Sequence, residues 1–193
     1  VCLVSSFAFS VSAALEALDV RDGKVYLDVG CGGGHLVKEL GIAAGSEGRV
    51  VGIDPSRQMV ENARVICQDL SCVEIIEGDA SEIPVEDAQF DGLAALQVYE
   101  YVEDVGSALT EARRVLKLGC PIAIISILWE HCRFYGTERG LNERIIEAWR
   151  ANCSTKFFLW NSPVFYIEMD LEFRCEVISL ISKRLIRLIY LKI

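Results

Sequence analysis

The chain of 193 residues contains little histidine and no paired cysteine motif, and both shortages limit its chemistry. Its two histidines are His35 and His131, and its eight cysteines form no C-x-x-C pair. Structural zinc sites need four Cys or His ligands at short spacings, so the sequence predicts no metal site. We expect free thiols in a reducing, cytoplasmic environment, because several cysteines stand in apolar runs where a thiol behaves as a small hydrophobic side chain.

Long hydrophobic runs and an excess of positive charge are also missing. No window of the sequence approaches the roughly 18 to 20 consecutive apolar residues of a membrane-spanning helix, so we expect no transmembrane segment. The 19 Lys and Arg residues are outnumbered by 28 Asp and Glu residues, which gives a net charge of −9. Such a charge repels a phosphate backbone. The sequence therefore favours a small-molecule partner over a nucleic acid.

The opening stretch, VCLVSSFAFSVSAALEAL, allows two interpretations. It is as apolar as the middle of a secretion signal, but it has neither an initiator Met nor a basic leading segment. Residues 13–18 show a helical pattern. We favour a first helix of the domain, in a chain whose true start is missing.

Apolar residues make up 52% of the chain, and they fall into short runs separated by charges and glycines. The expected strands are residues 25–29, 49–54, 73–80, 90–97 and 120–128. The expected helices are residues 35–45, 55–70, 105–119 and 138–153. In the first of them, we expect Leu36, Val37, Leu40 and Ile42 to form the inward, apolar face. Alternating strands and helices predict one α/β domain over residues 1–193, a doubly wound, Rossmann-like, mostly parallel sheet with helices on both faces.

The end of the chain departs from this alternation. The stretch CEVISLISKRLIRLIYLKI is compatible with two strands around Ser182 and Lys183 or with one amphipathic helix. We favour the strands, with an antiparallel last strand, because β-branched residues dominate. As a helix, its basic residues would allow contact with an anionic membrane surface. These residues are Lys183, Arg184, Arg187 and Lys192.

The stretch LDVGCGGGHL, residues 27–36, places a glycine turn directly after a predicted strand. Such a turn lets the backbone approach a ligand at a helix N-terminus. The dinucleotide fingerprint G-x-G-x-x-G requires a third glycine where His35 or Val37 stands, so neither frame fits. The stretch does fit D-x-G-x-G-x-G. Its members are Asp28, Gly30, Gly32 and Gly34.

Three aspartates stand at or just past predicted strand ends. They are Asp28, Asp54 and Asp79. Because ligands bind at the carboxyl ends of strands in doubly wound sheets, we expect these side chains to gather along one edge.

Four stretches, in this order, resemble the motifs of class I S-adenosylmethionine-dependent methyltransferases, in the group of type 11 methyltransferase domains. They are VYLDVGCGGGH, VVGIDPSRQMVENAR, EGDASEIPVEDAQFD and LAALQVYEYVEDVGSALTEARRVLKLG. The resemblance covers residues 13–130, and it implies S-adenosylmethionine as cofactor and a small molecule as methyl acceptor. Residues 154–193 match the family poorly, and we expect a divergent end, a truncated end or a non-native reading of the gene.

The resemblance also implies a set of cofactor-binding residues. They are Asp28, Gly30, Cys31, Gly32 and Gly34 at the amino-acid end, Asp54 at both ribose hydroxyls, Met59, Asp79 and Ala80 near the adenine, and Gln97 near the sulfonium. Carboxylates suit this cofactor, which carries two cationic groups and two hydroxyl donors. Its leaving group is already activated, so the protein mainly aligns and desolvates the reactants. We therefore assign no catalytic residue from the sequence.

The segment after the fourth strand carries further candidates. We expect Tyr99 and Tyr101 to be packing residues, although the family usually has His where Tyr101 stands. We expect Glu100, Glu103 and Asp104 to form a solvated acidic turn, with a contact from Glu100 to the substrate as the alternative.

Two other functions remain open at this stage. One is a binding-only domain that keeps the cofactor site without turnover, because Leu118, Gly119 and Cys120 replace the family's usual Pro-Gly-Gly. The other is a nicotinamide-dependent oxidoreductase, a class of enzyme that binds its cofactor with the same strand-turn-helix arrangement.

Overall fold

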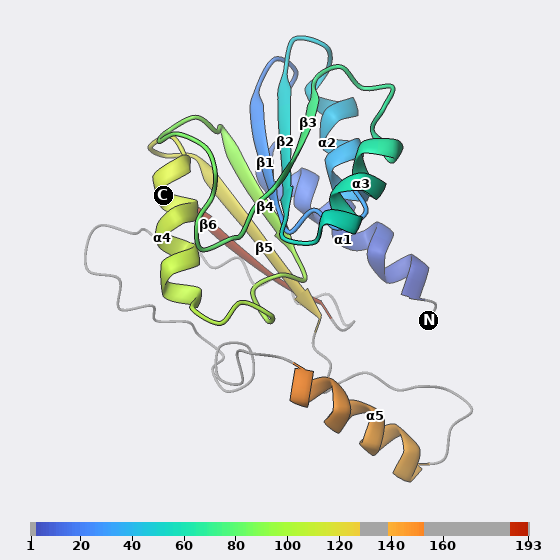
Figure 1. Ribbon diagram of the computed structural model, residues 1–193. Helices are drawn as coiled ribbons and strands as arrows, with labels where there is room; N and C mark the ends of the chain where they lie inside the picture. Colours follow the sequence, from blue (N-terminus) through green and yellow to red (C-terminus); the bar gives the residue numbers. More distant parts are fainter. Residues whose placement is uncertain (1–2, 128–138, 153–185, 193) are drawn as a thin grey trace.

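A computed structural model describes residues 3–127, 139–152 and 186–192 of the chain (Figure 1). The helices are α1 (Leu3–Leu18), α2 (His35–Ala44), α3 (Arg57–Ile66), α4 (Val105–Val115) and α5 (Arg139–Asn152). The strands are β1 (Val25–Val29), β2 (Arg49–Asp54), β3 (Val73–Glu77), β4 (Gly92–Leu96), β5 (Pro121–Ile127) and β6 (Ile186–Lys192).

The strands form a sheet in the order β3-β2-β1-β4-β5-β6. Strands β1 to β5 pair in parallel, and β6 pairs antiparallel with β5, from Pro121 opposite Lys192 to Ile127 opposite Ile186. The chain runs outward from β1 to β3 and then returns to the other side of β1 with β4. The order therefore reverses between β1 and β4, where doubly wound sheets bind their ligands.

Helices cover both faces of the sheet (Figure 1). On one face, α4 buries Ala108, Leu109 and Ala112 in a core that includes Leu93 and Ala95 of β4. On the other face, α1, α2 and α3 pack over a second core. Alternate residues of one strand thus face two cores, as they do in a sheet that is buried on both sides. The predicted parallel, Rossmann-like α/β architecture is confirmed.

Several element ends differ from the sequence prediction. The strand expected over 73–80 ends at Glu77, because Asp79 instead bridges Glu82 in the following turn. The helix expected over 105–119 ends at Val115, since Leu116 is already extended and Gly119 has a φ of +79°.

The inward face of α2 was also partly mispredicted. Leu36, Val37 and Leu40 are buried as expected, but Ile42 is 56% exposed. Gly41 takes the inward position instead, and a Cβ there would stand 2.6 Å from a methyl carbon of Val73. Glycine has no side chain, so a hydrophobic pattern in the sequence does not reveal that Gly41 packs against its neighbours.

The chain ends are described in part. The helix expected at the start is present as α1, and the helix expected over 138–153 is present as α5. Of the predicted strand pair near the end, the second strand corresponds to β6, whereas the first lies outside the described residues. Among the helices described here, each is too short or too polar to cross a membrane.

Candidate functional site

The turn between β1 and α2 owes its shape to glycines with a left-handed backbone. Gly30, Gly32 and Gly34 have φ values of +68°, +52° and +87°. A Cβ on Gly34 would stand 2.8 Å from the Cα and Cβ atoms of Ala63 in α3, whereas a Cβ on Gly32 would meet nothing within 4 Å. The turn is therefore packed from behind and open at Gly32, where the backbone can come close to a ligand.

Asp54, the last residue of β2, connects this turn to β2 through hydrogen bonds. Its Oδ2 accepts a hydrogen bond from the Gly32 backbone N–H at 2.9 Å, and its Oδ1 accepts one from the Ser56 backbone N–H at 2.9 Å. Each carboxylate oxygen has a second acceptor position. The carboxylate can therefore keep the turn in place and still accept hydroxyl groups from a ligand.

A cavity of about 520 Å³ lies beside Asp54 at the carboxyl edge of the sheet. The predicted cofactor residues among its lining are Gly30, Asp54, Asp79, Ala80 and Gln97. The structure thus brings together four segments that are far apart in sequence. The other predicted residues do not line this cavity: Asp28, Cys31, Gly32, Gly34 and Met59.

Gln97 enters the cavity wall with an unusual backbone. Its φ is +58°, which is uncommon for a residue with a side chain. The Gln97 N–H donates a hydrogen bond to the Ile125 carbonyl oxygen at 2.7 Å, which ties the end of β4 to β5. Left-handed residues of this kind concentrate at functional sites, where the surrounding structure holds them.

Asp28 lies in the middle of the sheet, behind the glycine turn. It is 1% exposed, and neither carboxylate oxygen has a hydrogen-bond partner among the described residues. Burial, and then the nearby charge of Asp54, raise the pKa of Asp28 well above its ordinary value. A buried carboxyl without partners is costly, so a ligand group that donates hydrogen bonds or carries positive charge would relieve it.

Cys31 and Met59 occupy different environments from each other. Cys31 is 7% exposed, and burial raises the pKa of its thiol, which keeps it neutral. Met59 is 38% exposed on α3, while its helical neighbours Val60 and Ala63 are buried. Neither position shows which ligand atom it would contact, so the roles of both residues stay predictions.

The segment after β4 differs from the expected acidic turn at one position. Glu103 and Asp104 are exposed, and Asp104 Oδ1 accepts a hydrogen bond from the Ser107 N–H at 3.0 Å at the start of α4. Glu100 is only 2% exposed, so its expected place in a solvated turn was wrong. Its side chain turns toward β5, where the Ser126 hydroxyl donates a hydrogen bond to it.

The two tyrosines of this segment have different environments. Tyr99 is fully buried, which confirms its predicted packing role. Tyr101 is 40% exposed and lines the cavity, so the same prediction for Tyr101 was wrong. Val98 and Val102 also line the cavity, and the sequence analysis missed them because they look like ordinary core residues.

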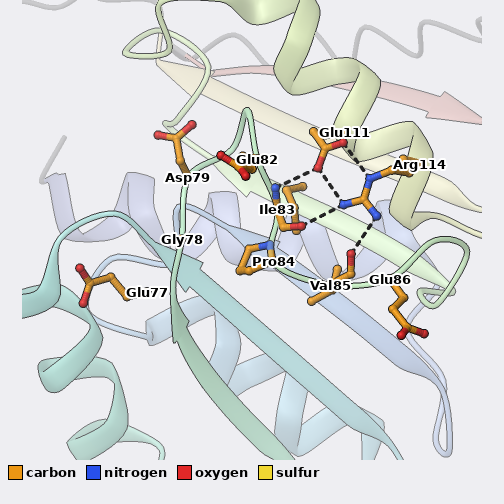
Figure 2. A pocket seen from close by; sticks show the side chains of 10 residues that line it. All are labelled: Glu77, Gly78, Asp79, Glu82, Ile83, Pro84, Val85, Glu86, Glu111 and Arg114. Atoms are coloured by element: carbon orange, nitrogen blue, oxygen red, sulfur yellow. Dashed lines mark hydrogen bonds and ion pairs between the residues drawn. The ribbon is translucent and has the colours of Figure 1, made fainter.

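A neighbouring cavity of about 650 Å³ lies between the segment after β3 and α4 (Figure 2). Arg114 of α4 donates hydrogen bonds to the Ile83 and Val85 carbonyl oxygens at 2.9 and 2.8 Å, and to Glu111 at 2.7 Å. Glu111 in turn accepts one from the Ile83 N–H at 2.9 Å. These bonds hold the segment whose earlier residues, Gly78 and Asp79, line both cavities.

The sequence analysis did not single out Arg114. Its only signal in the sequence is a position three residues after Glu111, which is the spacing of a helical ion pair. That spacing is common on helix surfaces and carries no information about the loop carbonyls that the guanidinium reaches.

The part of the chain that the structure describes has no cluster of three or more His, Cys, Asp or Glu side chains placed to hold a metal ion. The four cysteines described there are not in disulfide bonds: Cys31, Cys67, Cys72 and Cys120.

Comparison with known proteins identifies the kind of domain. The family described as "Methyltransferase domain" matches residues 27–124, which is just over half of the chain. An uncharacterized 37.1 kDa protein in transposon TN4556 of Streptomyces fradiae is 44% identical over 108 residues, covering 56% of this chain and 31% of that protein. The demethylmenaquinone methyltransferase of Staphylococcus aureus (strain MRSA252) is 39% identical over 105 residues, covering 54% of this chain and 44% of that protein. The match thus spans less than half of either relative.

The fold has a close counterpart among solved structures. An S-adenosylmethionine-dependent methyltransferase from Aquifex aeolicus superposes with a TM-score of 0.68 over 95% of this chain and 89% of that chain, at 20% identity. A likeness at this identity concerns the fold. It supports the same arrangement of strands around the glycine turn.

Proposed function

Since this chain belongs to the methyltransferase domain family, we propose that it binds S-adenosylmethionine and transfers the methyl group to a small-molecule acceptor. The observation that carries the proposal is the cavity at the carboxyl edge of the sheet. It joins Gly30 of the turn, Asp54 at the end of β2 and Asp79 after β3, and its described lining includes carboxylates but no Lys, Arg or His. Such a cavity favours a ligand with positive charge and hydroxyl donors.

The residues fit this cofactor in a specific arrangement. We assign the ribose hydroxyls to Asp54, whose two oxygens each retain an acceptor position. Asp28 suits the cationic amino-acid end, because its buried carboxyl has no hydrogen-bond partner among the residues that the structure describes. Ala80 and Asp79 are assigned to the adenine, and Gln97 to the neighbourhood of the sulfonium.

When bound, S-adenosylmethionine supplies an activated methyl group. The protein residues then have to orient the two reactants and exclude water, which accounts for a large share of the rate in reactions of this type. We also infer that residues 1–193 form one domain, that β6 completes the native sheet as its antiparallel last strand, and that the protein works in the cytoplasm. The register of β6 on β5 supports the second inference, and the free thiols support the third.

Isothermal titration with S-adenosylhomocysteine tests the cofactor assignment. We expect one site in the wild-type protein and at least a tenfold loss of affinity in Asp54→Ala, because charge-assisted hydrogen bonds contribute roughly 1.5 to 3 kcal/mol. Asp69→Ala, which alters an exposed aspartate after α3, is the matched control and keeps full affinity. A folded protein that binds no S-adenosylhomocysteine, or that binds it equally well with Asp54→Ala, contradicts the proposal.

A binding-only domain is the second candidate function. It is favoured by the altered turn before β5, where Leu118 is 94% exposed. Transfer of a labelled methyl group from S-adenosylmethionine to any small molecule would exclude it. A nicotinamide-dependent oxidoreductase is a weaker candidate, which requires NAD(H) to compete with S-adenosylhomocysteine at the glycine turn.

A further inference from the structure

Part of the lining of the cavity beside Asp54 is not used by the cofactor assignment. It comes from one segment, residues 98–104 between β4 and α4, and we call it the acceptor wall. Its members are Val98, Tyr101, Val102, Glu103 and Asp104. Because this segment directly follows Gln97, which we assigned to the neighbourhood of the sulfonium, it borders the place where a methyl acceptor has to bind.

Local contacts hold the acceptor wall against the glycine turn and against α4. The Tyr101 backbone N–H donates a hydrogen bond to the Val98 carbonyl oxygen at 2.8 Å, which closes a turn. The side chain of Val98 fills the space that a Cβ on Gly30 would need. Asp104 Oδ1 accepts a hydrogen bond from the Ser107 N–H at 3.0 Å at the start of α4. The wall is therefore fixed at both ends.

Tyr101 gives the acceptor wall an accessible aromatic ring. Its side chain lines the cavity and is 40% exposed, whereas Tyr99, two residues earlier, is fully buried. Val98 and Val102 are half-buried in the same wall. An aromatic ring attracts organic cations to its electron-rich face and also covers apolar groups. The wall thus suits a molecule that combines an apolar body with a positive charge.

The charges of the cavity favour the same kind of molecule. Its described lining contains four carboxylates and no Lys, Arg or His: Asp54, Asp79, Glu103 and Asp104. Hydrogen bonds from Ser107 lower the pKa of Asp104, so it stays ionised. Glu103 is exposed beside it. An anionic acceptor would be repelled from such a cavity, and a cationic one would be attracted.

We propose that the acceptor wall binds an amine with an apolar body, and that Tyr101 is the residue that makes the site specific for it. This inference rests on the proposed methyl transfer and names the class of its acceptor. Val98 and Val102 contact the apolar body, and the ring of Tyr101 contacts the end that carries the nitrogen. The carboxylate of Glu103 adds attraction for the ammonium form.

The step balances in atoms and in charge. The bound ammonium gives one proton to water, which leaves a lone pair on the nitrogen. This lone pair attacks the methyl carbon, the bond between that carbon and the sulfur breaks, and its electron pair stays on the sulfur, which gives S-adenosylhomocysteine. The positive charge of the sulfonium moves to the methylated nitrogen. A cation therefore remains beside the same carboxylates, which stabilise it before and after the transfer.

Three probes that share one apolar body test the preference for an amine. 1-Naphthylmethylamine, 1-naphthalenemethanol and 1-naphthaleneacetate carry a positive, a neutral and a negative group at about pH 7. Each is titrated into wild-type protein saturated with S-adenosylhomocysteine, so that differences in cofactor affinity do not enter the comparison. We expect the amine to bind at least about fivefold more tightly than the alcohol, and the acetate to bind more weakly than the alcohol. Added salt should reduce the preference, because it screens exposed charges.

Substitutions in the acceptor wall separate the ring from the charge. Tyr101→Leu keeps an apolar side chain without the ring, so it should lower the ratio of amine affinity to alcohol affinity at least about threefold. Tyr101→Phe keeps the ring and should retain the wild-type ratio. Glu103→Gln should lower the ratio about two- to threefold. Glu39→Gln, at an exposed position of α2, is the matched control and should leave the ratio unchanged.

The possible failures point to different parts of the proposal. Equal affinity of the wild-type protein for the amine and the alcohol, including no measurable affinity for either, overturns the amine acceptor. A wild-type ratio in Tyr101→Leu, or a loss in Tyr101→Phe as large as that in Tyr101→Leu, overturns the role of the Tyr101 ring. Failure of the wild-type protein to bind S-adenosylhomocysteine overturns the proposed function itself.

Discussion

At the scale of single residues, Asp28 shows how a binding group can be costly to the protein that carries it. Burial and the charge of Asp54 favour its neutral form. A group whose pKa is raised by folding stabilises the native state below its unfolded pKa of about 3.9, and this contribution is lost as the pH rises through the folded value. We therefore expect Asp28 to reduce stability at neutral pH in the absence of ligand.

The substitution Asp28→Asn tests this trade-off. We expect the variant to unfold at a higher temperature than the wild-type protein near neutral pH, because it has no charge to bury, and to bind S-adenosylhomocysteine at least tenfold more weakly. The stability difference should shrink as the pH is lowered toward the unfolded pKa of Asp28. Thermal unfolding across this pH range and calorimetric titration measure the two effects. A variant that is less stable than the wild-type protein at every pH would contradict the expectation.

Two glycines of the β1–α2 turn offer a second test at this scale. Gly34→Ala places a Cβ against the Ala63 backbone at a φ of +87°, and we expect it to destabilise the protein by roughly 2 to 4 kcal/mol. Gly32→Ala adds a Cβ in open space at a φ of +52°, and we expect a cost of only about 1 to 2 kcal/mol.

The two glycine variants should rank in the reverse order when their loss of ligand affinity is compared with their loss of stability. We expect Gly32 to lie at the amino-acid end of the cofactor, and a Cβ there would enter open space, so Gly32→Ala should lose more affinity for S-adenosylhomocysteine per kcal/mol of lost stability. Urea unfolding and calorimetry of both variants provide the comparison. If both variants lose the same affinity per kcal/mol of lost stability, the turn affects ligand binding only through the stability of the protein.

At the scale of secondary-structure elements, Arg114 couples α4 to the segment that follows β3. Figure 2 shows its guanidinium bonded to Glu111 and to two loop carbonyl oxygens. It also donates a hydrogen bond to Asp87 at 2.8 Å. The neighbouring carboxylates raise the pKa of Arg114, so it stays charged. The segment after β3 also contains Asp79 and Ala80, which line the cavity beside Asp54.

We expect Arg114→Lys to unfold at a lower temperature and to bind S-adenosylhomocysteine severalfold more weakly, because an ammonium group cannot reproduce the planar fork that reaches both carbonyl oxygens. Arg113→Lys, on the preceding helical position, is the matched control and should change neither property by more than about 0.5 kcal/mol. Thermal unfolding and calorimetry check both variants. Unchanged affinity in Arg114→Lys would show that the segment after β3 keeps its position without the hydrogen bonds of the Arg114 guanidinium.

Element positions were largely predictable from the sequence, and their ends were not. Short apolar runs located β1, β2 and β5 nearly to the residue, because strands buried on both faces consist of little else. The end of β3 depended on the turn at Asp79, and the end of α4 on Leu116, where local hydrogen bonds override the hydrophobic pattern.

At the scale of the whole molecule, the gathering of two of the three expected aspartates at one edge followed from topology. The third, Asp28, does not line the cavity, because it is buried inside β1. Asp54 and Asp79 share the cavity because parallel strands end together. The burial of Glu100 was not predictable, since it depends on a contact with Ser126 that lies 26 residues further along the chain. The cavity-facing position of Tyr101 was also not predictable. Tyr101 lies outside helices and strands, where no sequence period indicates the direction of a side chain.

The order of the strands also bears on how the molecule avoids self-association. β3 is the outer strand of the described sheet on one side, so its free edge is a place where another strand could add. This strand has five residues, and it carries Glu74 and Glu77 at exposed positions. Glu74 pairs with Arg49 of β2 at 2.7 Å, so repulsion from a second copy at this edge would come mainly from Glu77 and from the net charge of −9. The acidic composition that suits a cationic ligand thus also protects the sheet from edge-to-edge aggregation.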